Sequence, residues 1–390
     1  MDNSHALQEL WKPTCFTDEL SNICKPETRF NLGTWITDWT TRTRDQTNKL
    51  LKNSFKLSIM KHKGHISLLR PTTTKHDVPV LFQEPHVETG FRHPHQPWFY
   101  YICSIFQKHN ECMNVWTHLI GLLLTVSRTI EFSNEYDLIG NPHMWPLSAG
   151  LITMILMYLC STCAHCFSHK SELVHYTGFM IDYAGIGIFG LGSTIIHYAY
   201  CIHDTMLNSS LKMLSVPIGV ILGALVCICC TVSKVFYKRP YPFTRKIWQI
   251  GSVGGIYTWL SLPILHRLFL DKDGEDVSLY HHTSQMIWFA LAGFFFGSDI
   301  PQRFFPGKFD FVGHSHQIFH ICIILVTQKQ LDGVHLDIEK YHRTPAFVDE
   351  PSFMETFGAV ISLTIVCFLN VFIFHNVVKY RLGKENVKQE

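Results

Sequence analysis

The sequence predicts an all-α fold, a polytopic membrane helix bundle with a seven-helix core and an eighth C-terminal span. Charged residues make up 16% of the chain, whereas soluble domains carry about 25%. Apolar residues make up 47% and aromatic residues 13%. Several apolar segments also approach the length of about 20 residues that a membrane span requires. The lipid bilayer is therefore the expected partner, and a net charge of +2 gives no reason to expect a nucleic-acid partner.

The residues before the first apolar segment divide into two parts. Residues 1–75 are polar and basic with no sustained apolar period, which is typical of a mostly disordered cytosolic tail. The first thirty residues contain no apolar stretch like that of a signal peptide, so we expect membrane insertion to start from an internal helix. Residues 76–110 mix aromatic and turn residues and end in a short helix predicted from about Gln96. They indicate an interfacial segment lying along the membrane.

A transmembrane helix bundle is expected over residues 111–380, followed by a cytosolic tail at 381–390. The apolar segments predict spans at 112–131, 145–167, 176–201, 211–233, 247–270, 281–300, 311–330 and 355–378. The fifth and sixth are the least regular, because "SVGGIYTWLSLPIL" contains glycines and a proline and "SQMIWFALAGFFFGSDI" is short.

The distribution of Lys and Arg predicts the orientation, since short cytosolic loops are enriched in these residues. The N-terminal tail, the loop "SKVFYKRPYPFTRK" and the C-terminal tail are basic, whereas the loops after the first and fifth spans are acidic. Both termini are therefore expected in the cytosol. Asn208 belongs to an N-x-S sequon in a loop predicted outside, where glycosylation would require it to be.

The histidines of the stretch "FVGHSHQIFH" lead to the first candidate site. His316 and His320 are spaced i, i+4 and share one helix face, which makes a bidentate half-site for zinc. His314 points away from that face, because two residues turn a helix by about 200°, and is interpreted as an interfacial residue at the start of the span. In a chain with 24 histidines such pairs also arise by chance, so interfacial or packing roles remain open on spacing alone.

Topology places three further polar residues at the depth of this histidine pair. Ser161 and His165 are spaced i, i+4 near the predicted cytosolic end of the second span, and Asp182 follows in the first turns of the third. A carboxylate inside a membrane costs about 2.5–3.5 kcal/mol on insertion scales, so a functional role must be weighed against a packing role. The shared depth favours a zinc site near the cytosolic leaflet.

Three neutral imidazoles leave a fourth zinc position for water, which is the pattern of a catalytic rather than a structural site. In such a site Asp182 would hold and deprotonate the water, and Ser161 would donate a hydrogen bond to a ligand or to a developing oxyanion.

The other candidate side chains are interpreted as packing or interfacial residues. Thirteen cysteines, most of them in apolar runs, indicate reduced and buried thiols rather than a disulfide framework. The C-x-x-C of Cys163 and Cys166 has no second pair and is interpreted as packing. A polar packing network at the start of the first span is expected from Glu111, Asn114 and His118. Interfacial positions are expected for His169, His175, His197 and His266, which lie near the ends of spans.

Three motifs in order, "HNECMNVWTHLIG", "STCAH" with "KSELVHYTGFMIDYAGIGI", and "GHSHQIFHI", resemble the progestin and adipoQ receptor (PAQR) family over about residues 80–380. The segment "RHPHQPWFYYICSIFQKHNE" and the eighth span look more like its membrane progestin receptor branch than the adiponectin receptors. The resemblance implies zinc on His165, His316 and His320, with Asp182 and Ser161 at the family's aspartate and serine positions. It also implies a lipid-accessible cavity that opens toward the cytosol and, together with the sequon, favours the plasma membrane.

Two functions follow from this resemblance. One is a receptor that binds a steroid or similar lipid and signals to the cytosol, possible G-protein coupling included. The other is a zinc-dependent, ceramidase-like amidohydrolase that releases sphingoid base. An ordinary G-protein-coupled receptor fits poorly, because the predicted topology is N-in and the D-R-Y and N-P-x-x-Y motifs are missing. A channel is disfavoured because the polar candidates share one depth and do not line a path.

Overall fold

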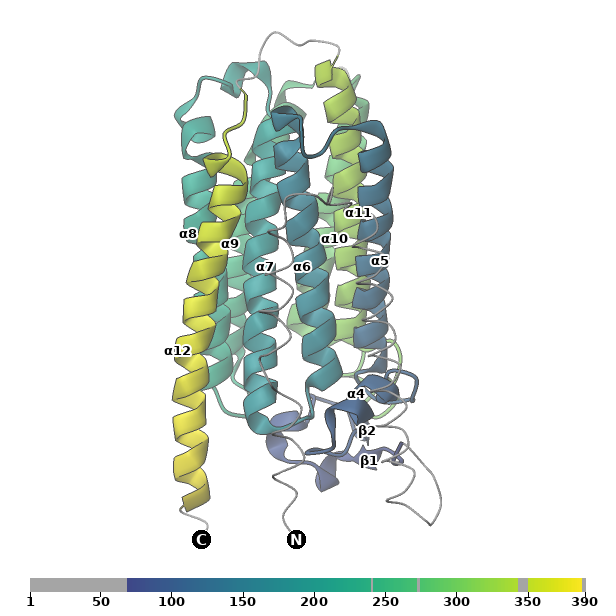
Figure 1. The fold of residues 1–390 in the computed structure, drawn as a ribbon. Helices are drawn as coiled ribbons and strands as arrows, with labels where there is room; N and C mark the ends of the chain where they lie inside the picture. Colours follow the sequence, from purple (N-terminus) through teal and green to yellow (C-terminus); the bar gives the residue numbers. More distant parts are fainter. Residues whose placement is uncertain (1–68, 240, 272–273, 343–349, 388–390) are drawn as a thin grey trace, which may run out of the picture. The chain divides into compact units, whose positions relative to one another are not determined.

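Eight long helices run side by side in the part of the chain that the structure describes (Figure 1). A computed structural model describes residues 69–239, 241–271, 274–342 and 350–387, so most of the predicted N-terminal tail lies outside it. The long helices are α5 (Cys112–Glu135), α6 (Trp145–Phe167), α7 (Glu172–Tyr200), α8 (Ser210–Phe236), α9 (Phe243–Leu270), α10 (Val277–Ser298), α11 (Ser315–His342) and α12 (Ala359–Val387). Each overlaps one predicted span, including the irregular fifth and sixth, although α11 and α12 continue beyond theirs.

Four helical stretches in the described chain are long and apolar enough to cross a membrane by length and composition. They are Pro142–Phe167, Glu172–Tyr200, Ser210–Phe236 and Met354–Glu385. The other long helices, α5, α9, α10 and α11, carry more polar residues and complete the bundle. The fold is therefore the predicted all-α polytopic membrane bundle.

Helix α7 lies at the centre of the bundle and packs against α6, α8, α9, α11 and α12. Its close approach to α8 depends on small residues, as is common between membrane helices. A Cβ added at Gly187 would lie 2.4 Å from the carbonyl oxygen of Gly223. The central position of α7 places Asp182, which is 7% exposed, inside the bundle.

The segment before α5 folds into short elements at one end of the bundle. Strand β1 (Thr73–Thr74) pairs antiparallel with β2 (Thr89–Phe91). Two single turns, η1 (Lys75–Asp77) and η2 (Val80–Phe82), lie between them, and α4 (Trp98–Ser104) follows. The helix predicted from about Gln96 is thus confirmed, starting at Trp98.

Two side chains attach this segment to the bundle. The buried guanidinium of Arg92 donates to the carbonyl oxygens of His165 (2.8 Å) and Cys166 (2.7 Å), at the C-terminal end of α6. Asp310, in the loop before α11, accepts from the backbone N–H (2.8 Å) and hydroxyl (2.7 Å) of Thr89. A cation suits a helix C-terminus, where carbonyl groups lack partners. Arg92 therefore holds the end of α6 that carries His165.

The last helix begins with a π-helical turn, η5 (Met354–Gly358), and continues as α12 along α7 and α8. The end of α12 and the start of α5 lie at the same end of the bundle as α4 (Figure 1). An even number of antiparallel helices requires this arrangement. We call it the α4 end and the other the far end.

Candidate metal site

Three histidines from two helices meet near the α4 end. His165 lies in the last turn of α6, and His316 and His320 lie in the first two turns of α11. One ring nitrogen of each lies within 4.8 Å of the others. The Nε2 atoms of His165 and His316 are 3.3 Å apart. Tetrahedral zinc holds two imidazole nitrogens about 3.3 Å apart, since each Zn–N bond is about 2.0–2.1 Å. The spacing therefore suits a shared metal ion.

Glu111, the residue before α5, orients His165. Its Oε2 atom lies 2.7 Å from Nδ1 of His165 and also accepts a hydrogen bond of 2.7 Å from the amide of Asn114. The carboxylate thereby favours a proton on Nδ1 and leaves Nε2 with a lone pair toward the other histidines. A carboxylate behind the far ring nitrogen is the usual support of a metal-binding histidine.

The same face of α5 supports His320. The hydroxyl of Thr117 lies 3.1 Å from Nδ1 of His320, and the ring of His118 stacks on the His320 ring with centroids 3.5 Å apart. The predicted polar network forms between Glu111 and Asn114, whereas the ring nitrogens of His118 have no hydrogen-bond partner among the described residues. These residues contact the histidines of the cluster and set their orientation.

Asp182 and Ser161 lie beside this cluster. Both are buried, at 7% and 2% exposure. Asp182 lies close enough to Ser161 and His165 to interact with both electrostatically. The structure thus gathers all five residues that the sequence singled out, from α6, α7 and α11.

His314 stands apart from the ligand group, although not through its angle on a helix. It precedes α11, and its Nε2 lies 3.4 Å from the carbonyl oxygen of Asn110. The interfacial assignments were wrong for four histidines. His314 is 2% exposed, and His169, His175 and His197 are 1–5% exposed. The folded segment at the α4 end covers His169 and His175. His197 is buried in a second polar cluster.

The described cysteines carry free thiols, in agreement with the absence of a disulfide framework. Cys166 is buried, with Sγ 3.6 Å from the carbonyl oxygen of Tyr101. Cys163 is exposed and lines an apolar pocket of about 280 Å³. The packing interpretation of the C-x-x-C therefore suits Cys166 better than Cys163.

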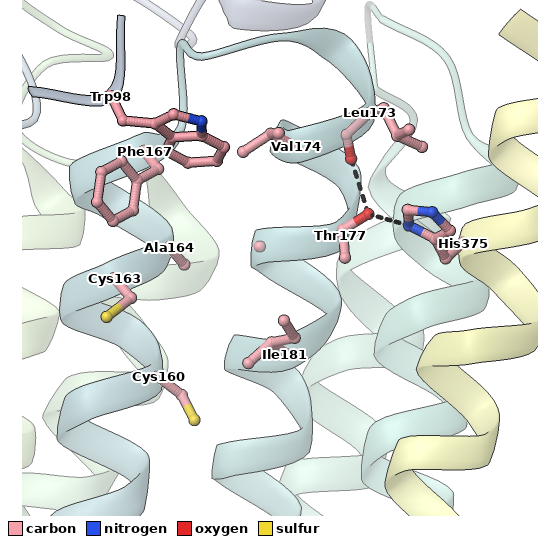
Figure 2. A pocket seen from close by; sticks show the side chains of 11 residues that line it. Trp98, Cys160, Cys163, Ala164, Phe167, Leu173, Val174, Thr177, Ile181 and His375 are labelled. Carbon is pink, nitrogen blue, oxygen red and sulfur yellow. Dashed lines mark hydrogen bonds between the residues drawn. The ribbon is translucent and has the colours of Figure 1, made fainter. Parts of the chain in front are cut away.

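Figure 2 shows that pocket, between α6 and α7 with His375 of α12 at its side. The hydroxyl of Thr177 lies 2.9 Å from Nδ1 of His375, which places one polar pair on an otherwise apolar wall. The lining residues Ala164 and Ile181 directly precede His165 and Asp182 in the chain. The pocket therefore occupies faces of α6 and α7 adjacent to those that carry His165 and Asp182.

These features define a class of protein: a multi-pass helical membrane protein with three histidines, an aspartate and a serine gathered near one end. Residues 106–331 match the family model described as Haemolysin-III related. The chain belongs to this family, which is the PAQR family of the resemblance above.

Curated relatives agree with this assignment. The chain is 34% identical to "Membrane progestin receptor beta" of Mus musculus over 298 residues, covering 76% of this chain and 83% of the relative. It is 36% identical to "Membrane progestin receptor beta" of Homo sapiens, covering 69% and 76%. It is 32% identical to "Membrane progestin receptor alpha" of Homo sapiens, covering 80% and 90%.

Proposed function

We propose that this protein is a zinc-containing multi-pass membrane receptor that binds a steroid or a similar lipid and signals to the cytosol. The observation that carries the receptor assignment is the similarity to proteins named membrane progestin receptors over more than two thirds of the chain. The α4 end, both termini and the basic loop 234–246 would face the cytosol at the plasma membrane, where a G protein is a possible partner.

The proposed zinc ligands are His165, His316 and His320. The support is the 3.3 Å separation of two Nε2 atoms and the Glu111 carboxylate behind His165. When bound, zinc polarises carbonyl oxygens as a Lewis acid and makes a water molecule nucleophilic at neutral pH. Glu111 and Thr117 would keep the rings in the tautomers that binding requires.

The apolar pocket supports the lipid part of the proposal. Its volume of about 280 Å³ is close to the lower limit of small-molecule pockets, about 300 Å³. Apolar walls suit steroid rings or an acyl chain, and the Thr177–His375 pair offers a hydrogen-bonding anchor for one polar atom of the ligand. A ligand bound there would press on α6 and α7, which also carry His165 and Asp182.

Binding of labelled progesterone to the purified full chain tests the receptor. We expect saturable binding that the double substitution Thr177→Val with His375→Phe weakens at least tenfold. Thr364→Val is the matched control, because the Thr364 hydroxyl bonds within its own helix, 2.7 Å from the carbonyl oxygen of Val360. Absence of saturable binding to wild type for progesterone and a panel of related steroids would refute the receptor proposal.

A hydrolase is the second candidate, because Asp182 and Ser161 lie beside the histidine cluster. In amide hydrolysis the C–N bond of a ceramide-like lipid breaks while a C–O bond to water forms. Asp182 would accept a proton from that water and pass it to the leaving amine. Ser161 would donate a hydrogen bond to the developing oxyanion. The products are a fatty acid and a sphingoid base, which would itself be a signal.

Fatty-acid release from ceramide, measured with the detergent-purified chain, tests the hydrolase. We expect release that Asp182→Ala abolishes and that Ser161→Ala lowers by about 10²-fold or more, as loss of an oxyanion donor does. Wild type with bound zinc but no release over a range of lipid amides would exclude this function. Steroid binding that survives in Asp182→Ala would then favour a receptor without catalysis.

The proposed orientation has its own test. Asn208 lies in the loop before α8, at the end of the bundle opposite α4. Expressed in cells that glycosylate, the wild type should lose apparent mass on treatment with an N-glycosidase, and Asn208→Gln should not. Glycosylation of a sequon introduced into loop 234–246 instead would reverse the orientation.

A further inference from the structure

A second group of potential metal ligands lies at the far end of the bundle. His197 is in the last turn of α7, Cys201 caps that helix, and His282 lies in the second turn of α10. One ligand atom of each lies within 4.8 Å of the others, and their exposures are 1%, 0% and 0%. His197 follows Asp182 by fifteen residues, which is about 22 Å along a helix. This group is therefore separate from the histidine cluster at the α4 end.

The separation of two of these atoms suits a tetrahedral metal. Sγ of Cys201 lies 3.6 Å from Nε2 of His282. Zinc bonds of about 2.3 Å to sulfur and about 2.0–2.1 Å to nitrogen place such atoms about 3.6 Å apart at the tetrahedral angle. His197 and Cys201 are spaced i, i+4, so both point from α7 toward α10. Thiolate and imidazole together favour zinc over harder cations such as magnesium or calcium.

The ring of His197 is held as a metal ligand is, whereas His282 would have to give up the proton that its Nε2 donates to Asp337. Nδ1 of His197 lies 2.8 Å from the carbonyl oxygen of Leu260, so it donates there and leaves the Nε2 lone pair facing the group. The side-chain amide of Gln285 lies 2.9 Å from Nδ1 of His282. The oxygen and nitrogen of the Gln285 amide can be exchanged without moving any heavy atom, and the amide oxygen then accepts a hydrogen bond from Nδ1 of His282. The amide of Gln330, 3.1 Å from Nε2 of His197, would have to turn away.

The described charges around the group balance one another as long as Cys201 is a neutral thiol. Arg267 pairs with two carboxylates, at 2.9 Å to Asp337 and 2.5 Å to Asp276. Asp337 also lies 2.9 Å from Nε2 of His282. The exposed Lys340, 3.5 Å from Asp276, offsets this charge from the surface. A thiolate at Cys201 would add a further buried negative charge, which a divalent cation compensates.

A glycine fixes the position of His282. A Cβ added at Gly333 of α11 would lie 2.7 Å from Cε1 of that ring. Close contact on this side keeps the ring beside Cys201 and Asp337. The group is therefore assembled by packing from α7, α10 and α11 and does not depend on a flexible loop.

We propose that His197, Cys201 and His282 form a second zinc site. Asp337 lies 2.9 Å from Nε2 of His282 but outside the group whose ligand atoms are all within 4.8 Å of one another, so its carboxylate would have to turn toward the metal to complete four-coordination. Such a closed site is structural. It would fasten the far ends of α7, α10 and α11 together. The proposal stands independently of the zinc proposed at the α4 end.

The amount of bound zinc tests the proposal, measured by mass spectrometry on the purified full chain. We expect two zinc ions per wild-type chain. Cys201→Ser and, separately, His316→Ala with His320→Ala should each retain one. Cys230→Ser is the matched control, because Cys230 is equally buried, at 2%, and lies outside both groups. It should retain two.

Cobalt substitution separates a metal ligand from a merely structural cysteine. A cobalt–thiolate bond absorbs in the near ultraviolet, and the α4-end cluster contains no cysteine ligand. We expect this absorption in the His316→Ala, His320→Ala chain, and its loss on adding Cys201→Ser. One zinc per wild-type chain, lost with His316 and His320 and without cobalt–thiolate absorption, would overturn the proposal and leave a hydrogen-bonded network. Zinc that is lost only with Cys201 would instead refute the α4-end site.

Discussion

The two polar clusters differ in what surrounds their histidines. At the α4 end, three imidazoles face one another with Glu111 behind one of them. At the far end, His282 belongs to a network with a guanidinium and two carboxylates. Ion pairs buried in a bundle hold helices together and are costly to break on one side. Paired imidazoles do little for packing but offer lone pairs to a ligand. Stability should therefore be most sensitive at the far end, and metal affinity at the α4 end.

Arg267→Ala should have the largest effect on stability. It leaves the carboxylates of Asp337 and Asp276 without their guanidinium, and breaking a buried pair costs about 3–5 kcal/mol. Thermal unfolding in detergent measures the loss. Arg128→Ala is the control, because its partners Glu131 and Asp332 are 57% and 33% exposed, and it should cost less than about 1 kcal/mol. Equal losses of stability in the two variants would mean that the buried ion pairs of the far end contribute no more than exposed ones.

Glu111→Gln should weaken metal binding at the α4 end by about 10–100-fold, the usual effect of losing a carboxylate behind a ligating histidine. Stability without metal should change less than in Arg267→Ala. Competition with a chelator measures the affinity. Glu131→Gln, an exposed change on the same helix, should leave it unaltered. A metal affinity that is unchanged in Glu111→Gln would contradict the proposed role of this carboxylate.

Gly333→Ala should destabilise the far end by about 1–3 kcal/mol, because the new methyl group would overlap the His282 ring. It should lower zinc at the second site and spare the first. At Gly251 an added Cβ meets no described atom within 4 Å, so Gly251→Ala should be neutral or stabilising by up to about 1 kcal/mol. Unfolding curves for both variants test this contrast. Full zinc content in Gly333→Ala would argue against a second site that depends on His282.

Thr117→Val should have the smallest effect, about 1 kcal/mol, since it removes one neutral hydrogen bond to His320 without changing the side-chain volume much. Metal affinity should fall by less than about tenfold. Chelator competition on Thr117→Val and on Glu111→Gln compares how much each of the two residues contributes to metal affinity. A larger loss in Thr117→Val would mean that Thr117, rather than Glu111, orients the site.

The sequence predicted the α4-end residues because two local rules sufficed. Helical spacing paired His316 with His320, and span direction brought Asp182 and His165 to their depth. The supports were not predictable in this way, because Glu111 and Arg92 reach α6 through tertiary contacts with residues more than 50 positions away.

At the far end, His197 was assigned to an interface, and its i, i+4 spacing from Cys201 was not used. The residues that this pair meets, His282 and Asp337, lie in parts of α10 and α11 that are less apolar than the middle of a span. The seventh span was predicted to end at residue 330, whereas α11 continues to His342. Asp337 sits in that continuation, fully buried by its ion pairs. Apolar length therefore marks where a chain can contact lipid, and underestimates a helix whose polar residues face its neighbours.

The attachment of the segment before α5 has a consequence for the order of synthesis. Arg92 contacts the end of α6, and Thr89 contacts Asp310, which follows 221 residues later. Six long helices, α5 to α10, leave the ribosome between these two partners. The segment before α5 is therefore synthesised before these six helices, but it completes its contacts with the bundle only after they have been made. A chain interrupted before Asp310 would insert most of its helices and still leave the α4 end unsealed, which gives cellular quality control a surface to recognise.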